Sequence, residues 1–277
     1  EEGRLVSNTI YEIKTKIQAN NSDFAILYRT NAQSRAIEES LRRKNINYKI
    51  YGGLSFYQRK EIKDLLAYFR LTVNINDEES LKRIINYPSR GIGTTTIQKL
   101  NLAANKYDVS IWEILSNIDK YEIKVNKGTR EKLSNFQILI DNFINNSKTK
   151  DAYEVAEYIT KSTGIYGLLY NDKTPEGITR FENVQELLNA IKNFTDSSEN
   201  NLNSLSDFIE DVALLTDQDQ ENEEDFNKVT LMTIHAAKGL EFKYVFVVGM
   251  EENLFPSMLS NESQESLEEE RRLFYVA

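Results

Sequence analysis

The densest group of residues able to do chemistry in this sequence is TIHAAKGLEF, at Thr233 to Phe242, between two apolar runs. Ligand chemistry in α/β proteins gathers where the strands of a sheet end. There, Lys238 could hold a phosphate, Gly239 could let a ligand approach the backbone, and Glu241 could bind a sugar hydroxyl. No phosphate-binding consensus is satisfied, so a polar connection in which Gly239 only permits a turn explains the same residues. The residues alone leave both interpretations open.

A second group, FYQRK at Phe56 to Lys60, puts aromatic side chains beside cations after the turn-forming pair Gly52-Gly53. Proteins that bind single strands stack bases on aromatic rings and hold phosphates with cations. The ring of Phe56 would serve equally well in a hydrophobic core, and the residues by themselves favour the core.

A third group, Gly91-Ile92-Gly93-Thr94, precedes a predicted helix over Thr95 to Ala104. The first N–H groups of a helix form a site for an anion such as a DNA phosphate. Most Gly-x-Gly turns only connect helices, so the pattern is compatible with a simple connection as well.

Several residue patterns that would support other chemistry are missing from the sequence. The chain has no cysteine and one histidine, which excludes thiolate and multi-histidine metal sites, and we predict no metal ligand in it. No Gly-x-x-x-x-Gly-Lys-Ser/Thr sequence occurs, so the chain cannot form the P-loop that holds a triphosphate and Mg²⁺. We therefore predict no catalytic residue within it.

The composition, 40% hydrophobic and 28% charged residues, predicts folded cores rather than general disorder. No apolar run is long enough to span a membrane and the first residues do not resemble a signal peptide, so we expect a cytoplasmic protein without membrane contact. The net charge of −9 argues against DNA binding through overall charge. Much of the acid is concentrated at Asp217 to Asp225 and Glu262 to Glu270, which leaves room for a local basic track.

The apolar periodicity of the first third predicts alternating strands and helices. The predicted elements are a strand over 23–28, a helix over 33–44, a strand over 46–50 and helices over 61–73 and 81–85. Asn31 or Ser34 is the expected N-cap of the helix over 33–44.

Helical periodicity then continues almost without interruption from Gly91 to about Gln220, and β character returns over 229–234 and 244–248. The economical interpretation is an α/β domain with a parallel sheet, interrupted by an all-helical domain. We expect residues 1–88 and 226–277 to form the α/β domain and residues 89–225 to form the inserted domain.

The groups described above lie within longer segments that resemble one helicase family. VTLMTIHAAKGLEFKYVFVVGMEE, at Val229 to Glu252, resembles motif V of the UvrD/PcrA/Rep group of superfamily 1 DNA helicases, and LFPS at Leu254 to Ser257 continues it. EEERRLFYVA, at Glu268 to Ala277, resembles the start of motif VI. AILYRTNAQSRAIEESL, at Ala25 to Leu41, and YGGLSFYQRKEIKDLLAYFRL, at Tyr51 to Leu71, are similar to the blocks that open the second RecA-like domain of that family.

The predicted inserted domain carries further pieces that resemble the same family, PSRGIGTTTIQKL at Pro88 to Leu100 and GIYGLLYNDKTPEGITRFENVQELL at Gly164 to Leu188. The resemblance therefore implies that the α/β domain is RecA-like and discontinuous. It also implies roles for individual residues. ATP binding is implied for Glu241, Gly239 and Lys238, single-stranded DNA binding for Thr233, His235, Arg59 and Phe56, and duplex contact for Gly91, Gly93, Thr94 and Thr95.

The function that the resemblance implies is that of the C-terminal part of an ATP-dependent 3′–5′ DNA helicase in repair or replication. The full-length protein would use ATP and Mg²⁺ and would bind single-stranded DNA and a duplex junction. Its expected partners are an N-terminal motor domain and repair or transcription proteins. Without a P-loop, this chain alone is expected to bind no cofactor and to be inactive. A docking module for protein or DNA and a subunit of a helicase–nuclease are the alternatives.

Overall fold

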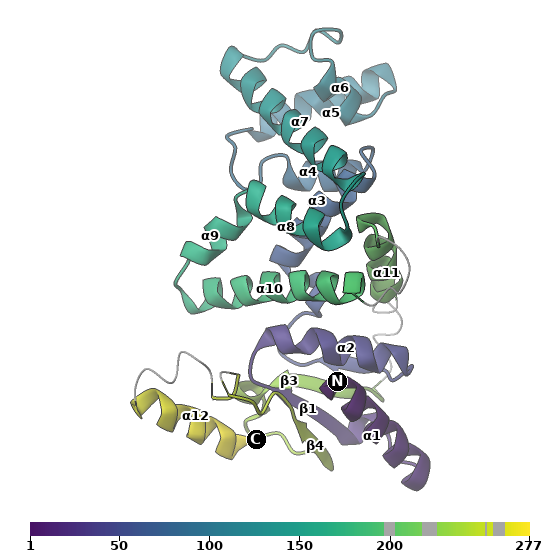
Figure 1. Cartoon of the computed structure of the whole chain (residues 1–277), viewed down its shortest axis with the longest axis vertical. Helices are drawn as coiled ribbons and strands as arrows, with labels where there is room; N and C mark the ends of the chain where they lie inside the picture. Colours follow the sequence, from purple (N-terminus) through teal and green to yellow (C-terminus); the bar gives the residue numbers. More distant parts are fainter. Residues whose placement is uncertain (197–202, 218–225, 253, 257–263) are drawn as a thin grey trace. The chain divides into compact units, whose positions relative to one another are not determined.

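A computed structural model describes residues 1–196, 203–217, 226–252, 254–256 and 264–277 of the chain (Figure 1). The chain forms two compact units, which we name the sheet unit, residues 1–59 and 214–277, and the helical unit, residues 60–213. The sheet unit is discontinuous in sequence because the helical unit interrupts it. The predicted fold class, a parallel-sheet α/β domain of the RecA-like type with a helical insertion, is confirmed.

The sheet unit is built on four parallel strands in the order β2-β3-β1-β4. Their bounds are β1 Phe24–Tyr28, β2 Tyr48–Ile50, β3 Val229–Thr233 and β4 Tyr244–Val247. All five residues of β1 are buried, as its continuous apolar run predicts for a central strand covered on both faces.

Alternate residues of β1 face two different cores, because successive side chains of a strand point to opposite faces of the sheet. Phe24, Ile26 and Tyr28 pack with helices α1 (Glu2–Ile17) and α2 (Ser34–Arg43). Ala25 and Leu27 pack on the other face with the short helix η5 (Ile234–Ala237) and with helix α12 (Gln264–Val276). The sheet is thus covered by helices on both faces (Figure 1).

The helical unit is organised around α3 (Lys60–Val73), which packs against α4, α7, α8 and α10. Ten residues of α3 are buried, so this helix is covered nearly all round. The other helices are α4 Glu78–Ile84, α5 Thr94–Tyr107, α6 Ile111–Ser116, α7 Lys127–Ser147, α8 Ala152–Ser162, α9 Ile165–Asn171 and α10 Pro175–Asp196; α11, Leu205–Asp217, runs from this unit into the sheet unit.

The bounds of the compact units differ from the predicted domain boundaries. The units divide after Arg59 and before Leu214, whereas the sequence predicted divisions after residues 88 and 225. The physical reason at the first boundary is that α3 and α4 pack with helices of the helical unit. Residues 218–225, most of the predicted acidic linker, lie outside the described residues.

Two helices of the sheet unit, α1 and α12, were not among the predicted elements. The predicted N-cap of α2 was also wrong. The cap position is occupied by Gln33, whose side chain does not cap the helix, while Asn31 lies in the preceding short helix η2 (Asn31–Gln33) and Ser34 is the first residue of α2.

Candidate functional site

The carboxyl edge of the parallel sheet carries a topological switch point, because the connections that follow two neighbouring strands lead in opposite directions along the sheet. Strand β1 pairs directly with β3, with Tyr28 opposite Thr233. From β1 the chain continues to β2 on one side, and from β3 it continues to β4 on the other side. The connections that follow β1 and β3 therefore start side by side and lead to opposite faces of the sheet, where α2 and η5 pack, which is the arrangement that forms a ligand crevice in open α/β sheets.

The loop after β3 presents two residues of the predicted single-stranded DNA site. Thr233 ends β3 and is half-buried, and His235 is exposed in η5. Partial removal from water lowers the pKa of His235, and the positive charge of Arg29 lowers it further; the carboxylates of Glu270 and Glu269 oppose these effects. His235 is therefore a mainly neutral side chain at pH 7 and is able to accept or donate a hydrogen bond.

The predicted ATP-binding residues follow on the same loop and are all exposed: Lys238, Gly239 and Glu241. Gly239 has a φ of 83°, a conformation that favours glycine, and a Cβ there would meet no atom within 4 Å. The backbone at Gly239 is consequently open to a close approach. A cation, an accessible backbone and a carboxylate fit the phosphate and sugar groups of a nucleotide.

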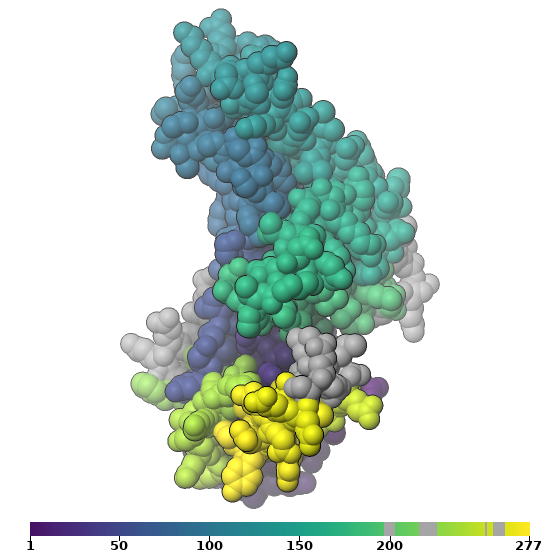
Figure 2. Space-filling view, turned by 90° about the vertical axis from the view of Figure 1, so that its left-hand side faces the viewer, coloured from purple at the N-terminus to yellow at the C-terminus, as the bar shows by residue number. Residues whose placement is uncertain are grey.

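An ion pair that the sequence analysis missed connects the end of β1 to α12. The guanidinium of Arg29 donates to both carboxylate oxygens of Glu270, at 3.0 and 3.1 Å from Nε and at 2.7 Å from Nη2. The Glu270 side chain is 8% exposed, so α12 is fixed to the candidate site by a largely buried contact. Figure 2 shows the yellow surface of α12 against the yellow-green surface of the segments that carry β3 and β4. The arginine immediately after a buried strand was the available signal.

Gln33 was also missed, and it shapes the loop after β1. Its Oε1 accepts the backbone N–H groups of Arg29, at 2.9 Å, and of Thr30, at 2.8 Å. Gly249, just after β4, has a φ of 70°, and a Cβ on it would lie 1.8 Å from Nε2 of Gln33. Gln33 is therefore used to hold the sheet edge, which explains why it does not cap α2.

Phe56 does not have the exposed ring that base stacking requires. Its side chain is fully buried, as the core interpretation expects, and a role of Phe56 in binding single-stranded DNA stays a prediction. Arg59 is 8% exposed; its guanidinium lies over the Phe56 ring and donates to the carbonyl oxygen of Asn31 and to Oγ of Ser34, both at 2.8 Å. Arg59 thus has a structural role in these contacts, and binding of single-stranded DNA by Arg59 stays a prediction.

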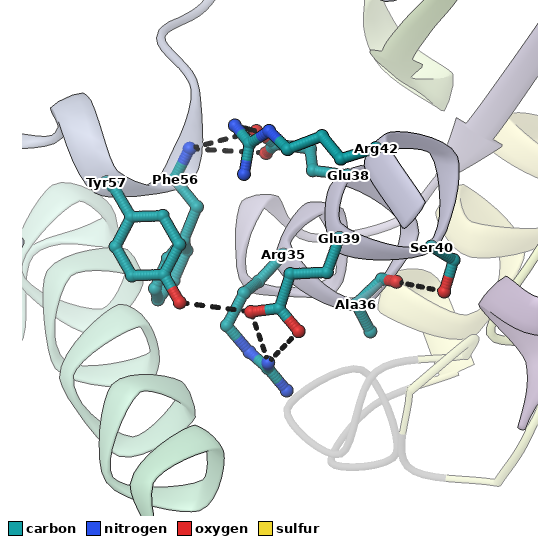
Figure 3. Close-up of polar contacts among 8 residues, drawn as sticks. All are labelled: Arg35, Ala36, Glu38, Glu39, Ser40, Arg42, Phe56 and Tyr57. Carbon is teal, nitrogen blue, oxygen red and sulfur yellow. Dashed lines mark hydrogen bonds and ion pairs between the residues drawn. The ribbon is translucent and has the colours of Figure 1, made fainter. Parts of the chain in front are cut away.

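Two carboxylates of α2 hold the segment that contains Phe56 (Figure 3). The buried carboxylate of Glu38 accepts the Phe56 N–H at 3.2 Å, accepts the Tyr48 hydroxyl at 3.1 Å and pairs with Arg42. Glu39 accepts the hydroxyl of Tyr57 at 3.0 Å. Burial raises the pKa of Glu38, and the Ser34 hydroxyl and the charge of Arg42 oppose this shift.

In the helical unit, the predicted duplex-contact residues Gly91, Gly93, Thr94 and Thr95 are all exposed. They lead into α5, whose N-cap is Gly93. The side chain of Ile92 is buried and anchors the turn in the core. Oδ1 of Asn86 accepts hydrogen bonds from the N–H groups of Arg90 and Ile92, each at 3.0 Å. The turn therefore presents free helix N-terminal backbone on a fixed support.

The guanidinium of Arg90 provides the second support of this turn. It donates to the carbonyl oxygens of Ile84, at 2.9 Å, and of Tyr87, at 2.8 Å, and to the Tyr68 hydroxyl at 2.6 Å. Arg90 is thus a structural arginine, although it lies next to a predicted DNA contact.

The sheet edge brings Thr233, His235 and the loop from Lys238 to Glu241 onto one connection, and the Gly91 to Thr95 turn belongs to the other unit. Within the described ranges, no three His, Asp or Glu side chains are grouped closely enough to hold a metal ion. None of the helices in the same ranges combines the length and the apolar character that crossing a membrane requires.

Comparison with known proteins places these features in one family. The family model for the UvrD-like helicase C-terminal domain matches residues 1–277. The chain is 42% identical to the ATP-dependent DNA helicase PcrA of Bacillus subtilis (strain 168) over 280 residues, covering 99% of this chain and 37% of that protein. It is 40% identical to proteins of the same name from Staphylococcus epidermidis, strain RP62A, and Staphylococcus aureus, strain Mu50, covering 92% of this chain and 35% of each relative. The chain thus spans little more than a third of these relatives.

Proposed function

The chain belongs to the UvrD-like helicase C-terminal domain family, and on that premise we propose that it supplies the second motor domain and the inserted helical domain of an ATP-dependent DNA helicase. The whole protein would move 3′ to 5′ along single-stranded DNA and unwind duplex DNA in repair or replication. The observation that carries this proposal is the family match, which spans residues 1–277 and so includes both compact units.

On this chain, Lys238, Gly239 and Glu241 would hold the nucleotide. The exposed ammonium of Lys238 would pair with a phosphate, the open backbone at Gly239 would allow close approach, and the Glu241 carboxylate would accept a ribose hydroxyl. ATP with Mg²⁺ supplies the free energy of hydrolysis. Because the chain contains no P-loop, the motion would come from closure of this motor domain against an N-terminal partner domain.

Thr233 and His235 would contact the backbone of single-stranded DNA from the same loop. The path that couples ATP binding to DNA binding would then be short, because Lys238 to Glu241 follow Thr233 and His235 on the same connection of the sheet. Arg59 would contribute by fixing Asn31 and Ser34 at the start of α2. Gly91, Gly93, Thr94 and Thr95 would receive duplex phosphates at the N-terminus of α5.

The test compares the full-length protein that carries this sequence with the chain of 277 residues alone. We expect ATP hydrolysis stimulated by single-stranded DNA in the full-length protein and none in the isolated chain. Replacing Thr233 and His235 by alanine should weaken binding of single-stranded DNA, whereas Thr15→Ala, at an exposed position of α1, should not. Hydrolysis by the rigorously purified chain, or an affinity unchanged by the double substitution, would contradict the proposal.

A further inference from the structure

The turn that follows β2, residues 51–54, exposes two large apolar side chains at the carboxyl edge of the sheet. We name it the Tyr51 turn. Tyr51 is 48% exposed and Leu54 is 57% exposed, and only Gly52 and Gly53 lie between them. Single exposed apolar residues are ordinary on protein surfaces. Two of them on one short turn, at the edge where α/β sheets bind ligands, form an apolar patch that indicates a binding site.

Both ends of the Tyr51 turn are fixed. On the strand side, the N–H of Tyr51 donates to the carbonyl oxygen of Leu231 at 2.8 Å, which extends the pairing of β2 with β3. On the other side, Glu38 and Glu39 of α2 hold the residues that follow the turn (Figure 3). A contact surface supported in this way keeps its geometry when it is free, and so loses little freedom on binding.

The neighbours of the turn indicate which occupant fits. A Cβ built on Gly52 lies 4.0 Å from Cβ of Ala236, which follows His235 in η5. The turn therefore adjoins the residues proposed to contact the DNA backbone. Residues 51–58 contain no carboxylate that would repel a phosphate. An exposed aromatic face beside polar side chains is the combination that binds single strands, because each base offers a π-face only when it is unpaired.

We propose that the ring of Tyr51, with Leu54 beside it, stacks on a base of single-stranded DNA. This inference rests on the proposed function and adds a base contact to it. In contrast to Phe56, which the sequence pattern suggested, Tyr51 has an accessible ring.

The experiment measures binding of a fluorescent oligo(dT) by the full-length protein and by three variants. Tyr51→Ala should weaken binding about five- to 140-fold, the range found for loss of one stacked base, while Tyr51→Phe should bind like wild type. Tyr11→Ala is the matched control, since Tyr11 is an exposed tyrosine on α1 of the same unit, and it should have no effect. Unfolding midpoints of all variants should agree, because both rings lie at the surface.

A set of oligonucleotides with one abasic site, moved stepwise along the strand, identifies the contact as stacking. One abasic position should weaken binding by the wild type but not by Tyr51→Ala. Equal affinities of wild type and Tyr51→Ala, or a loss that no abasic position shares, would overturn the inference while the proposed function stands; the second result would point to a protein occupant. Failure of the wild type to bind any single strand would contradict the proposed function itself.

Discussion

The Tyr51 turn and the Gly91 turn, residues 91–95, are both exposed and both contain a glycine with a positive φ, but they present different chemical groups at the surface. Each contains a glycine in the left-handed region, with a φ of 74° at Gly52 and 68° at Gly91. The Tyr51 turn exposes apolar side chains, whereas the Gly91 turn exposes backbone and small hydroxyl groups at the start of α5. The first surface suits the faces of bases and the second suits phosphates.

The supports of the two turns differ as well. The Tyr51 turn depends on the carboxylate of Glu38, whose side chain is 1% exposed and pairs with buried Arg42. The Gly91 turn depends on the neutral amide of Asn86 and on Arg90, which bonds to carbonyl oxygens and a hydroxyl. A turn that presents a ring is thus held by a buried charge pair, and a turn that presents backbone is held by neutral acceptors. The four predictions below test this contrast.

The largest difference is expected on removal of the supports. Glu38→Ala leaves the buried guanidinium of Arg42 without its carboxylate and should lower the free energy of unfolding by about 3–5 kcal/mol. Asn86→Ala removes one neutral acceptor from two N–H groups and should cost about 1–3 kcal/mol. Hydrogen exchange should rise at residues 51–59 in the first variant and at residues 90–95 in the second. Equal stability losses, or exchange that rises in the wrong turn, would contradict the contrast in supports.

The glycines should give a smaller, matched effect in both turns. Gly52→Ala and Gly91→Ala force an L-residue into the left-handed region and should each cost about 1–2 kcal/mol of stability. At Gly91 the added Cβ would also lie 2.6 Å from Nζ of Lys132, the flexible end of a side chain that can move away. Gly53→Ala and Gly93→Ala are the controls, because neither glycine has a positive φ and their added Cβ atoms would lie 3.4 and 3.9 Å from the nearest neighbours. Denaturation of the four variants measures this directly. If a control variant lost as much stability as its partner, steric room for a Cβ atom, and not backbone conformation, would be the reason for glycine at that position.

How far the sequence predicts these features depends on the range of the contacts. Strand β1 followed from its apolar run, and the sheet edge followed from the strands, since both are local patterns. The sequence favoured a core position for Phe56, but the burial of Arg59 could not be assigned, because its partner Ser34 lies 25 residues away. The resemblance pointed to the segment that contains Phe56, and the structure shows that the exposed ring near it belongs to Tyr51.

The elements missed by the sequence have a similar cause. Helix α1 buries only Gly3, Val6, Ser7 and Ile10, so its apolar pattern is too sparse to stand out in a charged stretch. The pair of Arg29 with Glu270 joins positions 241 residues apart, and no local spacing predicts it. The Gly91 turn was predicted as exposed helix N-terminal backbone because glycine, threonine and the following helix are adjacent in sequence.

A third, smaller effect should separate the two surfaces by charge. Thr94→Glu puts a carboxylate where a phosphate is proposed to bind, and it should weaken duplex-junction binding about two- to fivefold, the ratio given by ~0.3–1 kcal/mol at a helix end. The same change should not destabilise the free protein, because an acidic residue is favourable in the first turn of a helix. Gln98→Glu adds the same charge one turn later and should do less. If both variants bind the duplex equally well, or if only single-strand affinity falls, the phosphate assignment of the Gly91 turn is wrong.

The smallest effect is a difference in pH dependence. It arises because His235 directly precedes Ala236, the neighbour of Gly52 in the Tyr51 turn, while residues 91–95 contain no titratable side chain. Partial desolvation and the charge of Arg29 hold the pKa of His235 below its ordinary value of 6.5 in the free protein. A DNA phosphate beside the imidazole would favour the protonated ring, so binding takes up a proton and affinity for single strands should rise as pH falls from about 8 toward 6.

The stability of the folded chain changes with pH in the opposite direction to the affinity for single strands. The unfolded chain binds this proton more readily than the folded chain, so the contribution of His235 to stability is complete above 6.5 and is lost as pH falls below it. Affinities and unfolding midpoints measured from pH 6 to pH 8 in the wild type and in His235→Gln separate the two effects. The substitution should flatten the single-strand profile and leave the duplex profile unchanged. A single-strand profile that keeps its slope without His235 would remove this residue from the DNA contact and leave the Tyr51 turn as the better supported part of the edge.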